Sequence, residues 1–292
     1  MNFIQKTIAW YRRPHKSTVA QYVEAFIVIL PIAFVIRTYF YGLYQVPTGS
    51  METTMLVGER FFADKFTILF SAPKRGDIIT FNDPRYPYSN NRFKRLFERY
   101  VWGPSNWTKR VIGAPGDHVQ GKVEDGVPVV YLNGEKLHEP YLNKHPLIAV
   151  YRESMKCDIE FRSWDRDVAF DKQPFYAMTE YQALQAARLL RTYPEKATLE
   201  PYTPTYDNDG SCIDEFDVTL AKGQYWAMGD NRKYSHDSRA WGPLDEEFIH
   251  GKIVLRVLSF DSHDQWLIFD LIKNPIDFFK RIRWSRFLKR VY

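Results

Sequence analysis

Cysteine is scarce in this chain of 292 residues, which contains only Cys157 and Cys212. Neither has a second cysteine at the C-x-x-C spacing of common zinc sites, so no metal site is predicted. If the middle of the chain faces an oxidising compartment, the two thiols are able to form a disulfide. Two unpaired buried thiols fit the sequence nearly as well, and the spacing alone leaves both states open.

The sequence also lacks a nucleophile elbow, since no Gly-x-Ser-x-Gly run occurs. A Ser-His-Asp triad would have to use His118, His236 or His250, and none of these has neighbours typical of such a site. We therefore expect these histidines at the surface. The N-terminus has no pair of DNA-reading helices, which disfavours a soluble self-cleaving repressor, and no nucleic-acid partner is expected.

The composition is that of a globular protein, with 45% hydrophobic and 26% charged residues. This composition and length allow a sizeable core in one large or two modest domains. Aromatic residues make up 16% of the chain, including 19 Tyr and 21 Phe. Such rings favour β-strands, and rings with polar tips also favour a membrane boundary.

One long hydrophobic run lies near the start of the chain. Residues 19–36 are interrupted only by Gln21, Glu24 and Pro31. With its flanks the run gives about 20 helical residues, the length that crosses a bilayer core of roughly 30 Å. Glu24 lies within two turns of the start, where it can reach interfacial water. We predict a single transmembrane anchor over residues 18–40.

Charge around the anchor predicts its orientation. Residues 1–17 carry four cations and no acid, whereas only Arg37 is basic just after the run. This bias places the N-terminal segment in the cytoplasm and everything from about residue 40 outside. A cleavable secretory signal is the alternative, but the run is longer than the usual apolar region and no clean small-x-small site follows. An uncleaved anchor is favoured.

The rest of the chain is predicted to be mainly β. Arg75-Gly76-Asp77 indicates a turn into a β-branched strand, and Asn133-Gly134 is a type I′ hairpin signal. One helix is expected at 176–192, which is rich in helix formers. The expected strands are residues 78–81, 107–112, 127–132, 225–228 and 252–260.

Three blocks in order carry the functional signal. They are Val46-Pro47-Thr48-Gly49-Ser50-Met51, then residues 108–117 around Lys109, and then residues 228–242, where Gly, Asp and Asn accompany small hydroxyls and charges. A serine and a lysine placed behind an apolar anchor predict a hydrolase at a membrane surface. All three blocks in this order resemble bacterial type I signal peptidase. About half of the chain carries the resemblance.

The resemblance implies roles for individual residues. Ser50 would be the nucleophile and Lys109 the general base, while Ser235 would orient the lysine amine. The Thr48 hydroxyl and the Ser50 backbone N–H would form the oxyanion hole. Val46, Pro47, Met51, Met55, Trp107 and Thr108 would line the substrate pockets, and Asp230, Asn231, Arg232, Asp237 and Arg239 would brace the site.

A lysine base has an electrostatic requirement. Free lysine has a pKa of about 10.4, so it acts as a base near neutral pH only if burial lowers that pKa by roughly two to three units. The apolar neighbours Trp107, Val111 and Ile112 make a desolvated amine at Lys109 plausible.

The resemblance also implies a domain plan. A β-rich catalytic domain would comprise residues 41–119 and 223–265, with an inserted second β-domain at 120–222. Residues 266–292 mix cations with aromatic and aliphatic residues. This C-terminal segment suits either an anionic interface or a helix packed by its apolar stripe.

The implied enzyme is a membrane-anchored serine endopeptidase that removes N-terminal signal peptides from exported preproteins, cleaving after small residues. It would act at the outer (periplasmic) face of a bacterial inner membrane and would need no cofactor. Its partners would be preproteins and membrane phospholipids, and a monomer is expected.

The chain departs from the family pattern in three places, which are Glu52-Thr53, Trp107-Thr108 and residues 82–106. Glu52-Thr53-Thr54-Met55 stands where the family usually has an apolar residue followed by Pro-Thr-Leu. This favours a specialised peptidase for one dedicated substrate, and an inactive membrane-anchored β-scaffold is a third interpretation. Residues 82–106 form an aromatic and basic insertion that could enter the outer leaflet.

Overall fold

The computed structural model describes residues 17–51, 54–56, 59–100, 103–142, 147–151, 159–163, 203–259, 271–273, 275–280, 282 and 284–291. Three sequence predictions lie outside these residues: the helix expected at 176–192, the role of Cys157, and the structure of the Glu52-Thr53 departure. Cys212 is half-buried, and no disulfide joins it to another described residue.

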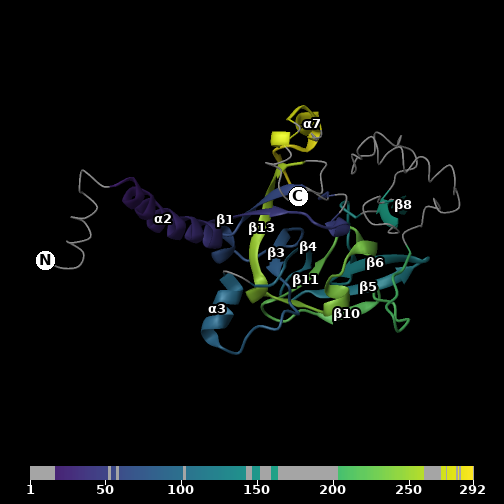
Figure 1. The fold of residues 1–292 in the computed structure, drawn as a ribbon. Coiled ribbons are helices and arrows are strands. Elements are labelled where there is room, and N and C mark those ends of the chain that lie inside the picture. The colour runs from purple at the N-terminus through teal and green to yellow at the C-terminus, as the bar shows by residue number, and fades with distance from the viewer. Residues whose placement is uncertain are drawn as a thin grey trace.

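The N-terminal helix occupies the predicted anchor. α2 (Thr18–Val35) runs directly into a π-helical turn, η1 (Ile36–Phe40). Its apolar side chains are exposed all round, and Figure 1 shows α2 projecting away from the β-rich body. In the part of the chain that is described, it is the one helix long and apolar enough to cross a membrane, over Gln21–Phe40. A helix that is apolar on every side needs an apolar environment.

An antiparallel sheet forms the body of the molecule, so the predicted mainly β fold is confirmed. Its strand order is β1-β2-β13-β3-β4-β11-β12, with β14 paired to β13. The strands are β1 (Tyr41–Gln45), β2 (Arg60–Asp64), β3 (Ile78–Asn82), β4 (Asn106–Gly113), β11 (Gln224–Met228), β12 (Leu244–Asp245), β13 (Ile249–Leu258) and β14 (Lys289–Arg290). The strand expected at 252–260 begins three residues earlier and ends at Leu258.

Both faces of this sheet are covered around β3 and β4. Ile78 packs with Met51 and Phe61, whereas its neighbour Ile79 packs with Val111 in a separate cluster. Adjacent side chains on a strand point to opposite faces, so the two clusters mark the two sides of the sheet. The apolar residues Ile78, Ile79 and Phe81 of β3 are accordingly all buried.

A second sheet packs against the first. It has the order β10-β5-β6-β7 and consists of β5 (His118–Glu124), β6 (Val127–Leu132), β7 (Glu135–Lys136) and β10 (Phe216–Thr219). The predicted hairpin turn joins β6 to β7, with φ of 52° at Asn133 and 86° at Gly134. Both values are left-handed, as a type I′ turn requires. β8 (Leu147–Tyr151) and β9 (Ile159–Ser163) form a further two-stranded sheet.

The inserted second domain expected at 120–222 is not confirmed. Val119 and Leu132 of the second sheet share one apolar cluster with Ile112 and Trp226 of the main sheet. The two sheets therefore bury each other at this contact rather than having wholly separate cores. The domain boundaries stay a prediction.

Short helices connect and flank the strands. They are η2 (Gly49–Met51), η3 (Thr67–Leu69), α3 (Arg92–Tyr100), η6 (Arg232–Tyr234), α5 (Ser238–Trp241), η7 (Glu246–Phe248), α7 (Pro275–Lys280) and η8 (Trp284–Arg286). α3 lies inside the aromatic, basic insertion, for which no helix was predicted. The described C-terminal residues pack on the body, because Phe278 and Ile282 are buried against Leu258.

Candidate active site

Ser50 lies in the short helical turn η2, just after β1. Its side chain is 8% exposed, and the next residue, Met51, is anchored in the apolar cluster beneath the sheet. Asn231 holds the turn from the other side. Its backbone N–H donates to the Ser50 carbonyl at 3.1 Å and its Nδ2 donates to the Gly49 carbonyl at 3.1 Å. The serine is therefore fixed through its backbone while its hydroxyl stays available.

Lys109 projects from the middle of β4 and meets this hydroxyl. Its Nζ lies 2.9 Å from Ser50 Oγ, and its side chain is 5% exposed. Burial lowers the pKa of Lys109 to about 8, against the opposing effect of the Asp237 carboxylate. Removal from water disfavours the charged amine, as the sequence argument required.

The nearby carboxylates do not restore the ordinary lysine pKa because each is matched by an arginine. Arg239 donates to both oxygens of Asp237, at 2.8 and 2.9 Å. Arg110 donates to both oxygens of Asp230, at 2.8 and 2.7 Å, and both partners of this pair are buried. Bidentate pairs of this kind leave little net charge to attract the Lys109 amine.

Gly229 permits the close approach of the site's segments. A Cβ at this position would lie 2.2 Å from Ser235 Oγ and 2.5 Å from the Ser50 carbonyl oxygen. Any other residue would push Ser235 or the Ser50 turn away. Gly229 lies between Met228 and Asp230 in the third sequence block, and this position was the available signal for its role. The sequence analysis did not name Gly229 as a site residue.

Ser235 and Thr48 differ in their contacts. The Ser235 hydroxyl is buried and has no hydrogen-bond partner among the described residues, so no hydrogen bond joins it to Lys109. The Thr48 side chain is exposed, and its Oγ1 lies 3.5 Å from Ser50 Oγ. Thr48 lies beside Ser50, and Ser235 lies close to the Ser50 turn, since a Cβ at Gly229 would contact both Ser235 and the Ser50 carbonyl oxygen.

The bracing residues form one buried network. Asp237 accepts from the Gly229 N–H at 3.0 Å, and Arg232 donates to the Gly229 carbonyl at 3.1 Å. Arg239 also reaches Asp214 Oδ1 at 2.6 Å. Arg110, Asp214 and Glu139, the ion-pair partner of Arg232, were missed as bracing residues. Sequence offers no direct signal for partners so far apart along the chain.

A cleft of about 410 Å³ opens beside Ser50 and Lys109. The six residues predicted to line substrate pockets all line it: Val46, Pro47, Met51, Met55, Trp107 and Thr108. His236 also lines the cleft, where its ring lies 5.8 Å from that of Trp107. Within the described sheet, β11 pairs with β4 only from Arg110 onward, so residues 106–109 keep one unpaired edge next to the cleft.

The expectation of surface histidines holds for His236, which is exposed, whereas His118 and His250 are half-buried. The Nδ1 atom of His250 is covered, and burial lowers the pKa of this histidine to about 3. Its strand, β13, lies inside the main sheet between β2 and β3, which explains the difference. Among the described residues, no group of three or more His, Cys, Asp or Glu side chains is arranged to hold a metal ion.

A buried amine of lowered pKa lies in contact with a serine hydroxyl, at the wall of a cleft with an open strand edge, and this arrangement is compatible with the chemistry of a serine hydrolase. A family model described as "Signal peptidase, peptidase S26" matches residues 19–258. The chain belongs to this family. It is a peptidase, and the function that follows is the removal of signal peptides from exported preproteins.

Several signal peptidases I align with most of this chain. Signal peptidase I of Aquifex aeolicus is 26% identical over 245 residues, covering 80% of this chain and 81% of the relative. That of Rickettsia bellii is 28% identical over 306 residues, covering 95% and 88%. That of Pseudomonas aeruginosa is 27% identical, covering 76% of this chain and 62% of the relative. A crystal structure of a signal peptidase I from Enterococcus faecalis is 21% identical, covers 62% of this chain and 97% of that chain, and has a TM-score of 0.30, so the fold above does not depend on it.

Proposed function

We propose that the protein is a membrane-anchored serine endopeptidase in which Ser50 is the nucleophile and Lys109 the general base. The distance of 2.9 Å between Lys109 Nζ and Ser50 Oγ, with the amine buried, is the observation that carries the proposal. A nucleophile and base within hydrogen-bond reach are what acyl transfer requires.

The reaction follows from this pair. Neutral Lys109 takes the proton from Ser50 Oγ as the oxygen bonds to the carbonyl carbon of the scissile peptide. The Ser50 N–H and the Thr48 hydroxyl stabilise the negative charge on the carbonyl oxygen. Lys109 then gives the proton to the departing amine, which leaves an ester on Ser50. Water, activated by the same amine, hydrolyses the ester and regenerates the serine.

Substrate binding uses the open edge of β4. An extended preprotein segment can pair with residues 106–109, which form no ladder on that side within the described sheet. Alternate side chains of the segment would then enter the cleft, where Val46 and Met55 limit the space. Apolar side chains that limit the space in this way favour small residues before the scissile bond.

Anchoring and orientation complete the proposal. The apolar helix over Gln21–Phe40 would span a bacterial inner membrane once, with residues 1–17 in the cytoplasm and the β-rich body on the outer, periplasmic face. The body then meets exported chains and phospholipids, as a monomer and without a cofactor. Asp230, Asn231, Arg232, Asp237 and Arg239 would act as positioning residues.

The test is cleavage of a model preprotein in phospholipid-containing detergent, comparing the wild type with Lys109→Ala and identifying the new N-terminus by mass spectrometry. We expect cleavage after a small residue by the wild type and none by the variant. Cleavage by both proteins would refute Lys109 as base. A panel of unrelated preproteins separates the alternatives. A peptidase with one dedicated substrate would cut a single preprotein of the panel, and an inactive scaffold would cut none.

A further inference from the structure

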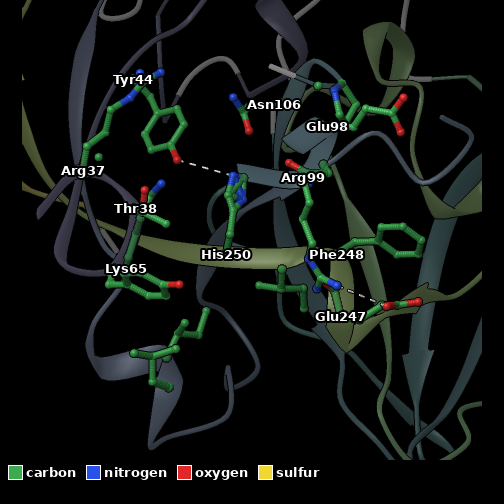
Figure 2. Close-up of a pocket in the computed structure, with 18 of the residues that line it drawn as sticks. Arg37, Thr38, Tyr44, Lys65, Glu98, Arg99, Asn106, Glu247, Phe248 and His250 are labelled. Atoms are coloured by element: carbon green, nitrogen blue, oxygen red, sulfur yellow. Dashed lines mark hydrogen bonds and ion pairs between the residues drawn. The ribbon is translucent and has the colours of Figure 1, made fainter. Parts of the chain in front are cut away.

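A second cavity, of about 380 Å³, lies where the N-terminal helix meets the main sheet. Its walls come from η1, β1, the loop after β2, the end of α3 and the start of β13, and Figure 2 shows its side chains. Arg37 and Tyr44 stand on one side and Arg99 and Glu247 on the other, with His250 between them. None of these residues has a role in the peptidase mechanism.

The two carboxylates of this cavity already have partners. Glu247 lies 3.5 Å from the guanidinium of Arg99. Glu98 accepts from the Ser89 N–H at 2.8 Å and lies 3.9 Å from the amine of Lys94. Neither acid is therefore available to neutralise the remaining cations of the cavity.

Arg37 and Lys65 are those remaining cations. Within the described part of the chain neither forms an ion pair, and the Lys65 amine lies 5.7 Å from the centre of the Tyr44 ring. Burial, and then the charge of Arg37, lower the pKa of Lys65. Arg37 is exposed and Lys65 is half-buried. Two positive charges that repel each other at one cavity are stabilised by a bound anion.

The wall between them is polar but uncharged. Burial lowers the pKa of His250 to about 3, so its ring is neutral at physiological pH. The Tyr44 hydroxyl lies 3.4 Å from His250 Nε2, while the buried Nδ1 has no hydrogen-bond partner among the described residues. The cavity thus offers two positive charges and neutral hydrogen-bonding groups at one place.

The rim of the cavity is apolar and faces solvent. Leu43 is 61% exposed and Leu69 56%, and both line the cavity. Phe70, the residue after Leu69, is 77% exposed. The rings of Phe40 and Phe66 stack at 5.1 Å between centroids, and the Phe70 ring meets Phe66 edge-on at 5.2 Å. Rings and aliphatic side chains gathered at the end of a membrane span sit at the level of lipid headgroups and upper acyl chains.

We propose that this cavity binds the phosphate headgroup of an anionic membrane phospholipid, with Arg37 and Lys65 as its charged contacts. Leu69 and Phe70 would lie against the acyl chains. Free phosphate could reach the same cations but would gain nothing from the apolar rim, which is why a lipid is the expected ligand. The proposal rests on the membrane anchoring proposed above.

Native mass spectrometry of the full chain in neutral detergent tests the site. The probes are phosphatidylglycerol, phosphatidylcholine with the same acyl chains, and inorganic phosphate. We expect the wild type to retain phosphatidylglycerol at least five times better than phosphatidylcholine. Arg37→Gln combined with Lys65→Gln should abolish this preference, and the charge-preserving pair Arg37→Lys and Lys65→Arg should keep it.

The matched control is Lys122→Gln combined with Lys222→Gln, which removes the same charge from exposed positions outside the cavity and outside the 82–106 insertion. Equal loss of the lipid in this control would overturn the site in favour of general charge attraction. If inorganic phosphate binds as tightly as phosphatidylglycerol, the assignment of a lipid as the ligand is overturned. Cleavage of a detergent-soluble peptide, measured in parallel, should be unchanged in the cavity variant, so a failure of the peptidase proposal would be seen separately.

Discussion

The Lys109 amine lies 2.9 Å from Ser50 Oγ and forms no ion pair within the described part of the chain. Its nearest acids, Asp237 and Asp230, are each held by an arginine. The amine is therefore buried beside a neutral hydroxyl, in surroundings that favour its uncharged form. Both the catalytic role proposed for Lys109 and its effect on stability depend on this arrangement.

The first prediction concerns the pH dependence of cleavage. Because the pKa of Lys109 is about 8, the neutral base becomes more abundant as pH rises to that value. We expect kcat/KM to increase about tenfold per pH unit well below pH 8 and to level off above it. A peptide assay between pH 6 and 10, with the fold checked at each pH by circular dichroism, measures this. A flat profile from pH 6 to 9 would contradict Lys109 as the base.

The second prediction concerns stability. The pKa of Lys109 is lowered from 10.5 in the unfolded chain to about 8 in the folded one, so the unfolded state binds more protons between these values. The free energy of unfolding should therefore rise with pH from 8 to 10.5. Replacing the amine by Lys109→Met should stabilise the protein at pH 7 by up to about 3 kcal/mol, with the gain shrinking towards pH 10.5.

Chemical denaturation at pH 7 and pH 10 checks this stability prediction. Ser50→Ala is the control, because it also removes activity but leaves the buried amine in place. An inactive Lys109→Met protein that is less stable than the wild type at pH 7 would show that the amine is not destabilising in the folded state.

The sequence predicted the elements that depend on local patterns. The apolar helix, strands β3, β4, β6 and β11 and the Asn133-Gly134 hairpin follow from hydrophobic runs and turn residues, which act over a few neighbours. α3 was missed although Phe93, Leu96, Phe97 and Tyr100 repeat at helical spacing, because the insertion was interpreted from its composition alone. That period was the signal for a helix.

Contacts between distant segments lay beyond sequence reasoning. Arg110 is separated from Asp230 by 120 residues, and nothing local marks the two as partners. Gly229 is required because Ser50 and Ser235 both approach it closely, and this proximity exists only in the folded chain. The resemblance supplied the candidate residues, whereas the burial that lowers the pKa of Lys109 and the arginine partners of the nearby carboxylates came from the structure.

The third prediction tests the oxyanion hole. Thr48 is exposed and lies beside Ser50, so Thr48→Ala should leave the fold intact while removing one donor from the developing negative charge. We expect kcat to fall by about 100-fold to 1,000-fold, with little change in KM or melting temperature. Thr219→Ala, an exposed threonine on β10 away from the cleft, is the matched control. Near-normal turnover in Thr48→Ala would refute the assignment.

The fourth prediction concerns cleavage preference. Val46 and Thr108 line the cleft beside Ser50, and a larger side chain at either position reduces the room for the substrate. We expect Val46→Phe or Thr108→Trp to lower kcat/KM for an alanine-containing site about tenfold relative to a glycine-containing site. Competition between the two peptides measures the ratio. Val127→Phe, on the second sheet, should leave it unchanged, and an unchanged ratio in all three variants would place the pocket elsewhere.

The fifth prediction concerns a contact that ties the C-terminal segment to the nucleophile loop. Glu59 is fully buried and accepts from Ser259 Oγ at 2.6 Å, Arg286 Nε at 2.6 Å and Arg256 Nε at 3.1 Å. Burial raises the pKa of Glu59, but the hydrogen bond and charge of Arg286 and the charge of Arg256 outweigh it and lower that pKa. Both arginines also donate to the Thr54 carbonyl, at 3.1 Å from Arg286 and 2.6 Å from Arg256.

Removing one arginine leaves a buried carboxylate short of its partner. Arg286→Ala should therefore reduce the free energy of unfolding by about 3 kcal/mol and also lower kcat, because the Thr54 loop follows Ser50 directly. Arg286→Lys should recover part of both losses. Arg290→Ala, which removes an exposed side chain from β14, should change neither. Arg286 lies beyond residues 19–258 of the family match, so full activity in Arg286→Ala would show that the shared peptidase body positions its nucleophile loop without the C-terminal segment.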